Sequence, residues 1–269
     1  MSNFSSNRQF SLALEALAEL LPELETKRAL TDAQSRLIPV PLAPALESVL
    51  DEVGPMPREA LFMGIALDGL PVLLNLHDPA PGPILVSGDP GAGKTAFLQN
   101  VARGAGLMHA PEDVQFGVIT AFPDEWVGFG DLPHCAGIFP VYASSAVDFL
   151  YSLSGWAHAN QRGQQSVVLL LDDLESMEQL DFDVRQTLRW LLLRGPARRV
   201  WPVVTVNAER TSQVEAWLEA FRTRMLGHMA ESHPGLFDGE DGPVFQSLKA
   251  GLQFALREGR EWMKFWVPT

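Results

Sequence analysis

One short segment constrains the fold of this chain more than any other, and it reads Gly88-Asp89-Pro90-Gly91-Ala92-Gly93-Lys94-Thr95. A glycine, four further residues and then Gly-Lys-Thr is the spacing of a P-loop, whose main-chain N–H groups surround the phosphates of a nucleotide. The apolar run 83–87 precedes the segment, and a helical pattern over 94–105 follows it. A strand that leads in and a helix that leads out bring phosphate to a helix N-terminus, so the sequence predicts an α/β fold built around this turn.

The side chains of this segment also predict its cofactors, ATP and Mg²⁺. We expect Lys94 to place its ammonium group beside the β- and γ-phosphates and the Thr95 hydroxyl to coordinate Mg²⁺. The residues predicted to bind the nucleotide are Gly88, Asp89, Pro90, Gly91, Ala92, Gly93, Lys94, Thr95 and Ala96. The alternative is a glycine-rich turn without a ligand, which the flanking strand and helix disfavour.

A second motif is an apolar strand, residues 167–171, that ends in Asp172 and Asp173. This is the form of a Walker B strand, in which the first carboxylate holds the magnesium shell, so we assign Asp172 to the metal together with Thr95. Asp173 stands where related ATPases often carry a glutamate that polarises the attacking water, and Glu175 is the reserve candidate for that base. The alternative is a buried strand followed by an acidic helix cap.

A third apolar run, residues 201–206, ends in Asn207 and predicts a further core strand. An amide at the end of such a strand can donate a hydrogen bond to the γ-phosphate or to the hydrolytic water, which makes Asn207 the sensor candidate. An asparagine that only ends a strand and turns the chain explains the pattern equally well.

Five arginines and no lysine lie between these last two strands and form the densest basic patch of the chain: Arg185, Arg189, Arg194, Arg198 and Arg199. In a ring of identical subunits, we expect Arg198 or Arg199 to reach the neighbour's nucleotide, while other arginines touch a phosphate backbone. The alternative is a solvated helix face paired with nearby aspartates. Arg222 and Arg224, on an amphipathic helix predicted over 212–229, are the second candidates for the same role.

The order of apolar and helical patterns predicts the architecture. A hairpin is expected from 62–67 and 71–76, and a second one at the C-terminus from 251–256 and 262–267. Between them, strands are expected at 83–87, 115–121, 137–141, 167–171 and 202–206, and helices at 94–105, 145–161, 182–194 and 212–229. Strands that alternate with helices favour a parallel sheet covered by helices on both faces.

The N-terminal region has a different character and predicts a separate helical segment. Apolar residues recur at helical spacing from Phe10 to Leu21, and a second short helix is expected over 45–53. Prolines close this stretch, so we place the boundary between an N-terminal helical segment, 1–58, and an ATPase domain, 59–269.

The composition excludes several classes of protein. The net charge of −13 disfavours a monomer that coats nucleic acid or an anionic membrane by bulk charge, so any contact with a polyanion must be local. A single cysteine, Cys135, excludes a disulfide framework, and the six histidines show no metal-ligand spacing. No apolar run approaches the roughly 20 residues that span a bilayer, so we expect a cytoplasmic protein without membrane contact.

Beyond the P-loop, the residues resemble the FtsK/HerA superfamily of ring-forming P-loop ATPases over about residues 62–269. The hairpin 64–72 before the P-loop strand is characteristic of the FtsK-type motor domain. Residues 132–134, Val141 and the end of a helix at 159–162 are similar to that family's segment between the second strand and Walker B. Residues 194–207 resemble its Gly-Arg-rich turn and sensor strand, and 222–225 resemble its Thr-Arg-Ile segment. Three departures stand out: Ala121-Phe122-Pro123 replaces a common Asp-x-Lys, Asp173 replaces Glu, and Asn207 replaces Gln. We also expect no winged-helix module, because the chain stops after the last hairpin.

The resemblance implies a RecA-like P-loop fold and ATP–Mg²⁺ bound between subunits of a homo-oligomeric ring, expected to be a hexamer. It implies water attack on the γ-phosphate, release of ADP, and DNA as a possible translocated substrate. The alternative is a nucleotide-dependent scaffold or regulator with little turnover, in which the N-terminal helices dock a protein partner. A small-molecule kinase is a third reading, disfavoured because no acceptor-binding motif stands out.

Overall fold

The computed structural model describes residues 43–160, 163–231, 233, 235–237, 241–258 and 261–269. The helix predicted from Phe10 to Leu21 lies outside these residues. The short helix predicted over 45–53 is present as α2 (Leu46–Val53) and packs its buried residues Leu46 and Val49 in one cluster with Phe62. The domain boundary at residue 58 stays a prediction.

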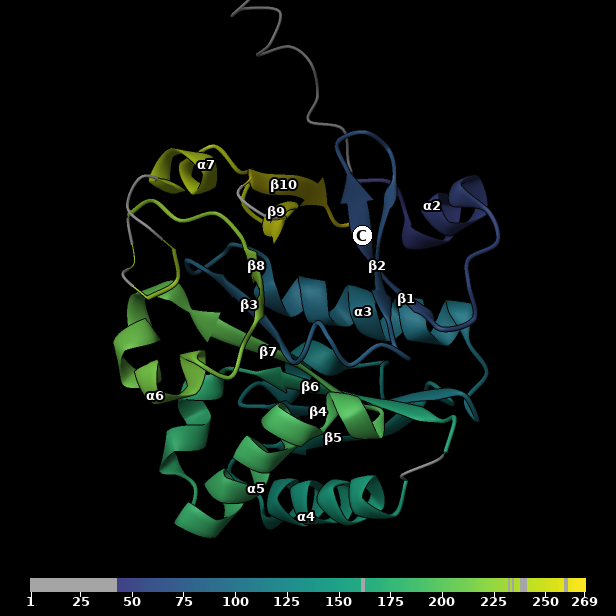
Figure 1. Ribbon diagram of the computed structural model, residues 1–269, viewed down its shortest axis with the longest axis vertical. Helices are drawn as coiled ribbons and strands as arrows, with labels where there is room; N and C mark the ends of the chain where they lie inside the picture. Colours follow the sequence, from purple (N-terminus) through teal and green to yellow (C-terminus); the bar gives the residue numbers. More distant parts are fainter. Residues whose placement is uncertain (1–42, 161–162, 232, 234, 238–240, 259–260) are drawn as a thin grey trace, which may run out of the picture. The chain divides into compact units, whose positions relative to one another are not determined.

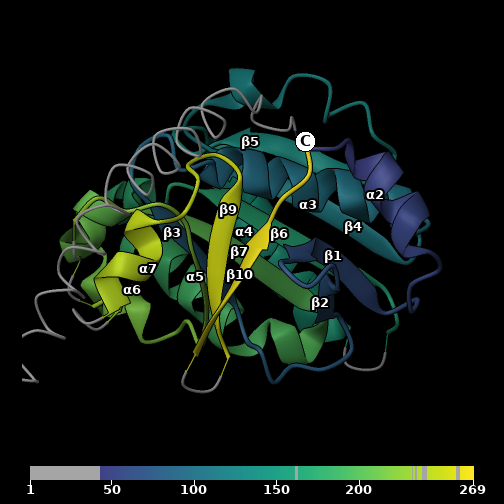
Figure 2. The same cartoon turned by 90° about the horizontal axis from the view of Figure 1, so that it is seen from above.

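The described residues form a ten-stranded sheet in the order β2-β1-β10-β9-β8-β3-β7-β6-β4-β5 (Figures 1 and 2). The strands are β1 (Ala60–Ala66), β2 (Pro71–Asn75), β3 (Ile84–Gly88), β4 (Val114–Thr120), β5 (Cys135–Pro140), β6 (Ser166–Asp172), β7 (Val200–Asn207), β8 (Thr223–Leu226), β9 (Gln253–Glu258) and β10 (Glu261–Trp266). From β8 to β5 every neighbouring pair is parallel, and both hairpins, β1–β2 and β9–β10, are antiparallel.

Helices cover both faces of the parallel part of the sheet, as the sequence predicted. On one face lies α3 (Lys94–Met108), and on the other α4 (Ser144–Ala159) and α5 (Phe182–Arg194) pack together (Figure 1). Short helices complete the described chain: η1 (Pro123–Trp126), η2 (Leu174–Gln179), η3 (Pro196–Arg198), η4 (Ala208–Gln213), α6 (Glu215–Leu218) and α7 (Gly242–Gln246). The predicted fold class, a P-loop α/β sheet between helices, is confirmed.

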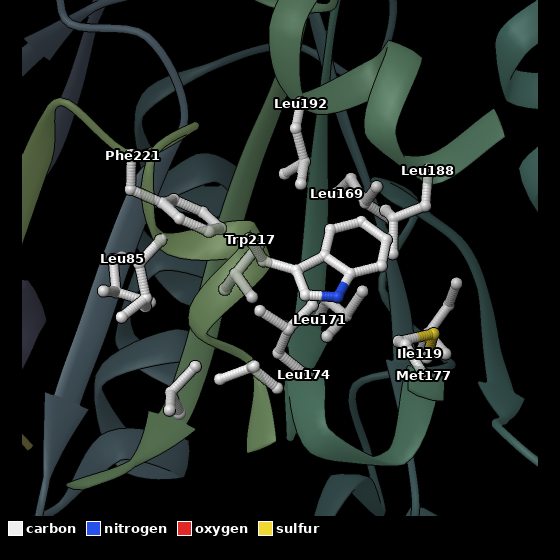
Figure 3. Close-up of a cluster of buried hydrophobic side chains, with 14 of the residues drawn as sticks. Leu85, Ile119, Leu169, Leu171, Leu174, Met177, Leu188, Leu192, Trp217 and Phe221 are labelled. Atoms are coloured by element: carbon white, nitrogen blue, oxygen red, sulfur yellow. The ribbon is translucent and has the colours of Figure 1, made fainter. Parts of the chain in front are cut away.

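Burial on both faces explains why the central strands read as continuous apolar runs. In β6, Leu169 and Leu171 belong to the cluster on the α4–α5 side, while Val168 and Leu170 belong to the cluster on the α3 side. Figure 3 shows the first of these clusters, with the Trp217 side chain packed among leucines of the sheet and of α5. A strand with two covered faces needs apolar side chains at every position, and its carboxyl end alone is free for polar residues.

The helix predicted over 212–229 is wrong. The chain forms η4 and the single turn α6 and then enters the sheet as β8, between β3 and β9. Met225 packs on the α3 side of the sheet and Leu226 on the opposite side, so this strand shows no apolar–polar alternation. Arg222 and Arg224 therefore lie at the amino end of a strand and not on a helix.

Candidate functional site

The P-loop connects the carboxyl end of β3 to the first turn of α3. Gly91 and Gly93 have left-handed φ angles of 81° and 89°, which favour glycine. A Cβ atom at Gly88 would lie 2.7 Å from the Cβ of Ala92, so the turn closes tightly on itself. The sequence thus places glycine where this turn needs it.

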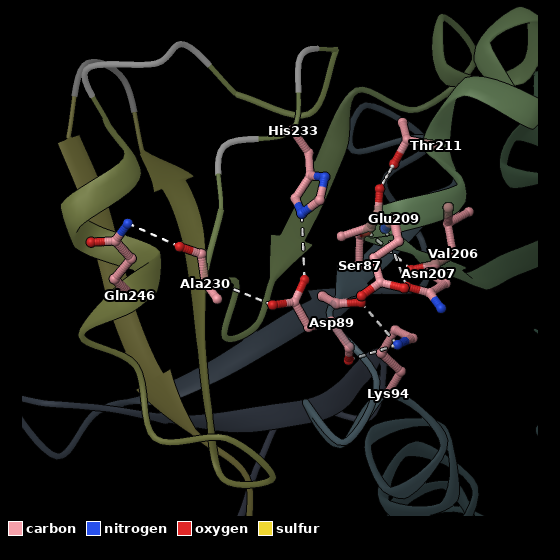
Figure 4. Close-up of polar contacts among 12 residues, drawn as sticks. Ser87, Asp89, Lys94, Val206, Asn207, Glu209, Thr211, Ala230, His233 and Gln246 are labelled. Carbon is pink, nitrogen blue, oxygen red and sulfur yellow. Dashed lines mark hydrogen bonds and ion pairs between the residues drawn. The ribbon is translucent and has the colours of Figure 1, made fainter.

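The Lys94 ammonium group lies within this turn. Its Nζ donates hydrogen bonds to the carbonyl oxygens of Gly88, at 2.9 Å, and Asp89, at 3.1 Å (Figure 4). Burial lowers the pKa of Lys94, an effect that the nearby carboxylates of Asp173, Glu175 and Asp172 oppose. The Lys94 ammonium group therefore bonds to neutral carbonyls and forms no ion pair with the described carboxylates, an arrangement suited to an incoming anion.

Thr95 and Asp172, the two predicted metal ligands, are brought together although 77 positions separate them. The Thr95 hydroxyl donates to Oδ2 of Asp172 at 3.0 Å, and the Thr205 hydroxyl donates to Oδ1 at 2.8 Å. Asp172 is 4% exposed, and burial raises its pKa against the two hydrogen bonds that lower it. A hydroxyl and a carboxylate beside a phosphate-binding turn are the oxygen donors that Mg²⁺ prefers, so the residues fit this ion.

Thr205 is a site residue that the sequence reasoning missed. It lies within β7, donates to Asp172 and accepts a hydrogen bond from the main-chain N–H of Asp173 at 2.8 Å. This single hydroxyl therefore fixes both aspartates that follow β6. The available signal was a hydroxyl near the carboxyl end of the apolar run 201–206, where a buried polar group needs partners.

The remaining acid and amide candidates lie at the same edge of the sheet. Asp173 has a left-handed φ of 73°, which turns the chain away from the end of β6. The carboxyl group of Glu175 is buried, and its Oε1 accepts a hydrogen bond from the main-chain N–H of Asn207 at 2.7 Å. Burial raises the pKa of Glu175. The side chain of Asn207 caps η4 by accepting a hydrogen bond from the N–H of Glu209 at 3.2 Å.

Arg198 and Arg199 lie at the opposite edge of the sheet. They precede β7, whereas Asn207 ends it, and seven steps of about 3.3 Å separate these edges by roughly 23 Å. Arg199 adopts a left-handed φ of 67° and donates from Nη1 to the Leu76 carbonyl at 2.9 Å. Neither arginine joins the P-loop of its own chain.

Segments from the C-terminal third of the chain contact the P-loop from two sides. No pattern in the sequence predicted these contacts. The Asp89 carboxylate accepts a hydrogen bond from the Ala230 N–H at 2.7 Å and lies 3.4 Å from Nε2 of His233 (Figure 4). On the other side, the Gly251 N–H donates to the Ala92 carbonyl at 3.1 Å. A Cβ atom at Gly93 would lie 2.7 Å from the Gly251 Cα, so glycine is needed for this close approach as well.

The described residues contain no group of three or more His, Cys, Asp or Glu side chains that could hold a metal ion. Within the same residues, every helix is too short or too polar to cross a bilayer.

The fold resembles solved structures of secretion and conjugation ATPases. ATPases 2 and 3 of Thermomonospora curvata EccC, in complex with a signal sequence peptide, match with a TM-score of 0.66 and 15% identity over 85% of this chain and 43% of that chain. ATPases 2 and 3 of EssC from Geobacillus thermodenitrificans match with a TM-score of 0.64 and 12% identity over 86% and 48%. The pCW3 conjugation coupling protein TcpA, with ATPγS, matches with a TM-score of 0.62 and 13% identity over 84% and 69%.

At these identities the likeness shows the fold alone, and the chain spans less than half the length of the EccC and EssC structures. The likeness agrees with the predicted P-loop ATPase fold, and the predicted resemblance to the FtsK/HerA superfamily stays a prediction. No curated protein matches the sequence significantly. The family model of the NACHT domain matches residues 82–234, a segment that carries the P-loop, Asp172 and Asn207 and is more than half of the 269 residues, so the chain belongs to the NACHT domain family.

Proposed function

We propose that this protein binds ATP with Mg²⁺ and hydrolyses it. The observation that carries the proposal is the hydrogen bond between Thr95 and Asp172, because it brings the metal-binding hydroxyl of the P-loop to the carboxylate of the Walker B strand. Thr205 holds that carboxylate from its other side. A glycine-rich turn without a ligand would not need these two contacts between separate elements.

Each group of site residues has a separate role in the proposed reaction. Main-chain N–H groups of the P-loop and the Lys94 ammonium group bind the phosphates, and Thr95 and Asp172 hold the metal ion. Bound Mg²⁺ neutralises phosphate charge in this kind of site. Asp173 orients or activates water, and Asn207 is the sensor at the end of β7.

Replacement of the P-loop lysine tests the proposal. Lys94→Ala should lower the affinity for ATP–Mg²⁺ at least tenfold and abolish phosphate release, since it removes the charge that faces the phosphates. Lys264→Ala is the matched control. Lys264 lies in β10, and its ammonium group donates a hydrogen bond to the Ser247 hydroxyl after α7 and not to the P-loop. Calorimetric titration of both variants with ATP–Mg²⁺ is the measurement, and equal affinities would refute the proposal.

The proposed working form is a homo-oligomeric ring, a hexamer by resemblance, that translocates DNA. The structural relatives include a conjugation coupling protein and an ATPase in complex with a signal sequence peptide, and the second of these supports a peptide as an alternative to DNA. DNA-stimulated hydrolysis that weakens as salt is added would support DNA. The solution mass with and without ATP and DNA tests the ring.

A second function, a nucleotide-dependent scaffold with little turnover, has its own structural support. The Glu175 carboxyl group is engaged by the Asn207 N–H, and the position after Asp172 carries the shorter aspartate. If Asp173 is a shortened base, Asp173→Glu should raise the turnover number. Tight ATP binding with negligible turnover in both proteins would favour the scaffold, in which the N-terminal segment binds a protein partner.

A further inference from the structure

Away from the P-loop, a cavity of about 360 Å³ opens where β8 begins beside the C-terminal hairpin. Arg222, Thr223 and Arg224 line it from β8 and the residue before it, and Arg257 and Trp262 line it from β9 and β10. Its volume falls at the lower end of the range for small-molecule pockets.

The cavity is basic although the chain carries a net charge of −13. Of its three arginines, Arg257 lies 3.6 Å from the Asp241 carboxylate, which neutralises one charge. Arg222 is exposed and forms no ion pair with the described residues. Among the described residues, three arginines less one paired aspartate leave about two positive charges on this wall.

Arg224 is held in place without being neutralised. Its guanidinium group donates to the main-chain carbonyls of Leu218 at 3.0 Å and Leu236 at 3.3 Å, and to those of Phe221 and Gly235. Burial lowers the pKa of Arg224, with no carboxylate among the described residues to oppose that effect. A fixed, partly buried guanidinium group surrounded by neutral oxygens gains most from an added anion.

Arg257 is also oriented by its neighbours. Its guanidinium carbon lies 5.5 Å from the centre of the Trp262 ring, and the two residues face each other directly across the β9–β10 hairpin. An arginine stacked on an aromatic ring loses little further freedom when it binds a ligand. Two of the three arginines are thus preorganised.

This cavity is separate from the nucleotide site. In the register of the parallel strands, Arg224 pairs with Leu85, three residues before the P-loop glycine Gly88, and Thr223 pairs with Ile84. The cavity therefore lies toward the amino ends of the strands, whereas the P-loop lies at their carboxyl ends. One phosphate group therefore cannot bind to the P-loop and to this cavity at the same time.

We propose that the pocket of Arg222, Arg224 and Arg257 binds a phosphate monoester, on a small molecule or at the end of a nucleic acid strand. A phosphate monoester carries a charge of roughly −1.5 to −2 at neutral pH, which matches the excess positive charge of the wall. A guanidinium group can donate two parallel hydrogen bonds to phosphate oxygens, which Arg222 is placed to do. Arg224 already donates four hydrogen bonds to carbonyls and contributes mainly its charge, and Thr223 lines the same wall.

The test titrates ribose 5-phosphate into the full chain in the presence of saturating ADP–Mg²⁺, which fills the P-loop. We expect saturable binding that falls at least tenfold in Arg222→Ala/Arg257→Ala. Arg58→Ala, which removes an exposed arginine just before β1, is the matched control and should bind as the parent does. Arg224 is left intact because it holds the loop carbonyls together.

A 5′-phosphorylated and an unphosphorylated oligothymidine distinguish the two sources of the phosphate. If only the phosphorylated strand competes with ribose 5-phosphate, the ligand is a nucleic acid end; if neither competes, it is a small molecule. Equal affinities of the double variant and the control, or no binding of ribose 5-phosphate to the parent, would overturn the proposal. If ADP–Mg²⁺ does not bind to the full chain, that result contradicts the proposed ATPase site and not this pocket. The titration with ribose 5-phosphate is then done on Lys94→Ala protein without ADP.

Discussion

At the scale of single residues, one hydroxyl group organises the predicted metal side of the site. Thr205 bridges the carboxylate of Asp172 and the main-chain N–H of Asp173. Because β6 and β7 are parallel neighbours, their carboxyl ends meet at the same edge, where this bridge fixes the direction of both aspartates. A position that reads as part of an apolar strand therefore controls the geometry of two acids.

Removal of this hydroxyl should separate catalysis from binding. Thr205→Val keeps the shape of the side chain but leaves the Asp173 N–H without its acceptor, at a cost of about 1–3 kcal/mol of unfolding free energy. We expect ATP affinity within a few-fold of the parent and a turnover number at least tenfold lower. Thr205→Ser, which keeps the hydroxyl, is the control, and a parental turnover number in Thr205→Val would contradict the assignment.

Glu175 gives the second prediction at this scale. Its carboxyl group is buried and its pKa is raised by that burial, with Asp173 acting in the same direction and Arg210 against it. The folded state therefore keeps the proton to a higher pH than the unfolded chain, and this group lowers stability as pH rises from about its ordinary value of 4.5 through the raised value.

Glu175→Gln removes this titration but can still accept the hydrogen bond from the Asn207 N–H. Denaturant unfolding from pH 4 to 8 should show the variant gaining stability relative to the parent as pH rises. Glu175→Ala should instead lose about 1–3 kcal/mol at neutral pH, because the Asn207 N–H loses its acceptor. A constant difference between Glu175→Gln and the parent across this range would show that the carboxyl group does not titrate differently in the folded state.

At the scale of elements, the sequence was sufficient where a pattern is local. The P-loop, the apolar runs that became β6 and β7, and both hairpins follow from spacing and turn residues over a few positions. The sequence was insufficient where a segment is buried by elements that are distant in the chain. β8 has only four residues, and its place between β3 and β9 depends on a neighbour about 140 residues earlier, so its apolar residues were read as one long helix. Other contacts between residues far apart in the sequence place Ala230 and Gly251 against the P-loop.

The junction of β1 with β10 gives a prediction at this scale. A Cβ atom at Gly64 would lie 2.7 Å from the Trp266 carbonyl oxygen and 2.6 Å from the Phe265 ring, so Gly64→Ala must push the strands apart. We expect a loss of about 1–3 kcal/mol in unfolding free energy. Gly155→Ala is the control, because that position in α4 has open space and alanine should stabilise the helix by about 0.5–1 kcal/mol. Equal stabilities of the two variants would show that the β1–β10 contact is loose.

At the scale of the whole molecule, the sheet separates the predicted functional groups between its two edges. The P-loop, Asp172 and Asn207 lie at the carboxyl ends of the strands, and Arg198 and Arg199 precede β7 at the amino end. Arg199 is further occupied by its hydrogen bond to the Leu76 carbonyl, which leaves Arg198 as the less constrained of the two. If either arginine stabilises transition-state charge, it must do so on the nucleotide of another subunit.

Subunit mixing tests this arrangement. Lys94→Ala subunits keep the arginines but lack a working P-loop, and Arg198→Ala subunits keep the P-loop but lack the arginine, so each protein alone should hydrolyse ATP at least tenfold more slowly than the parent. A mixture joins intact P-loops to intact arginines across subunit interfaces, and its activity should exceed the sum of the two separate proteins. Arg199→Ala, mixed in the same way, decides between the two arginines. Full activity of Arg198→Ala and of Arg199→Ala on their own would exclude both, because an arginine that acts between subunits cannot be removed from every subunit without loss of turnover.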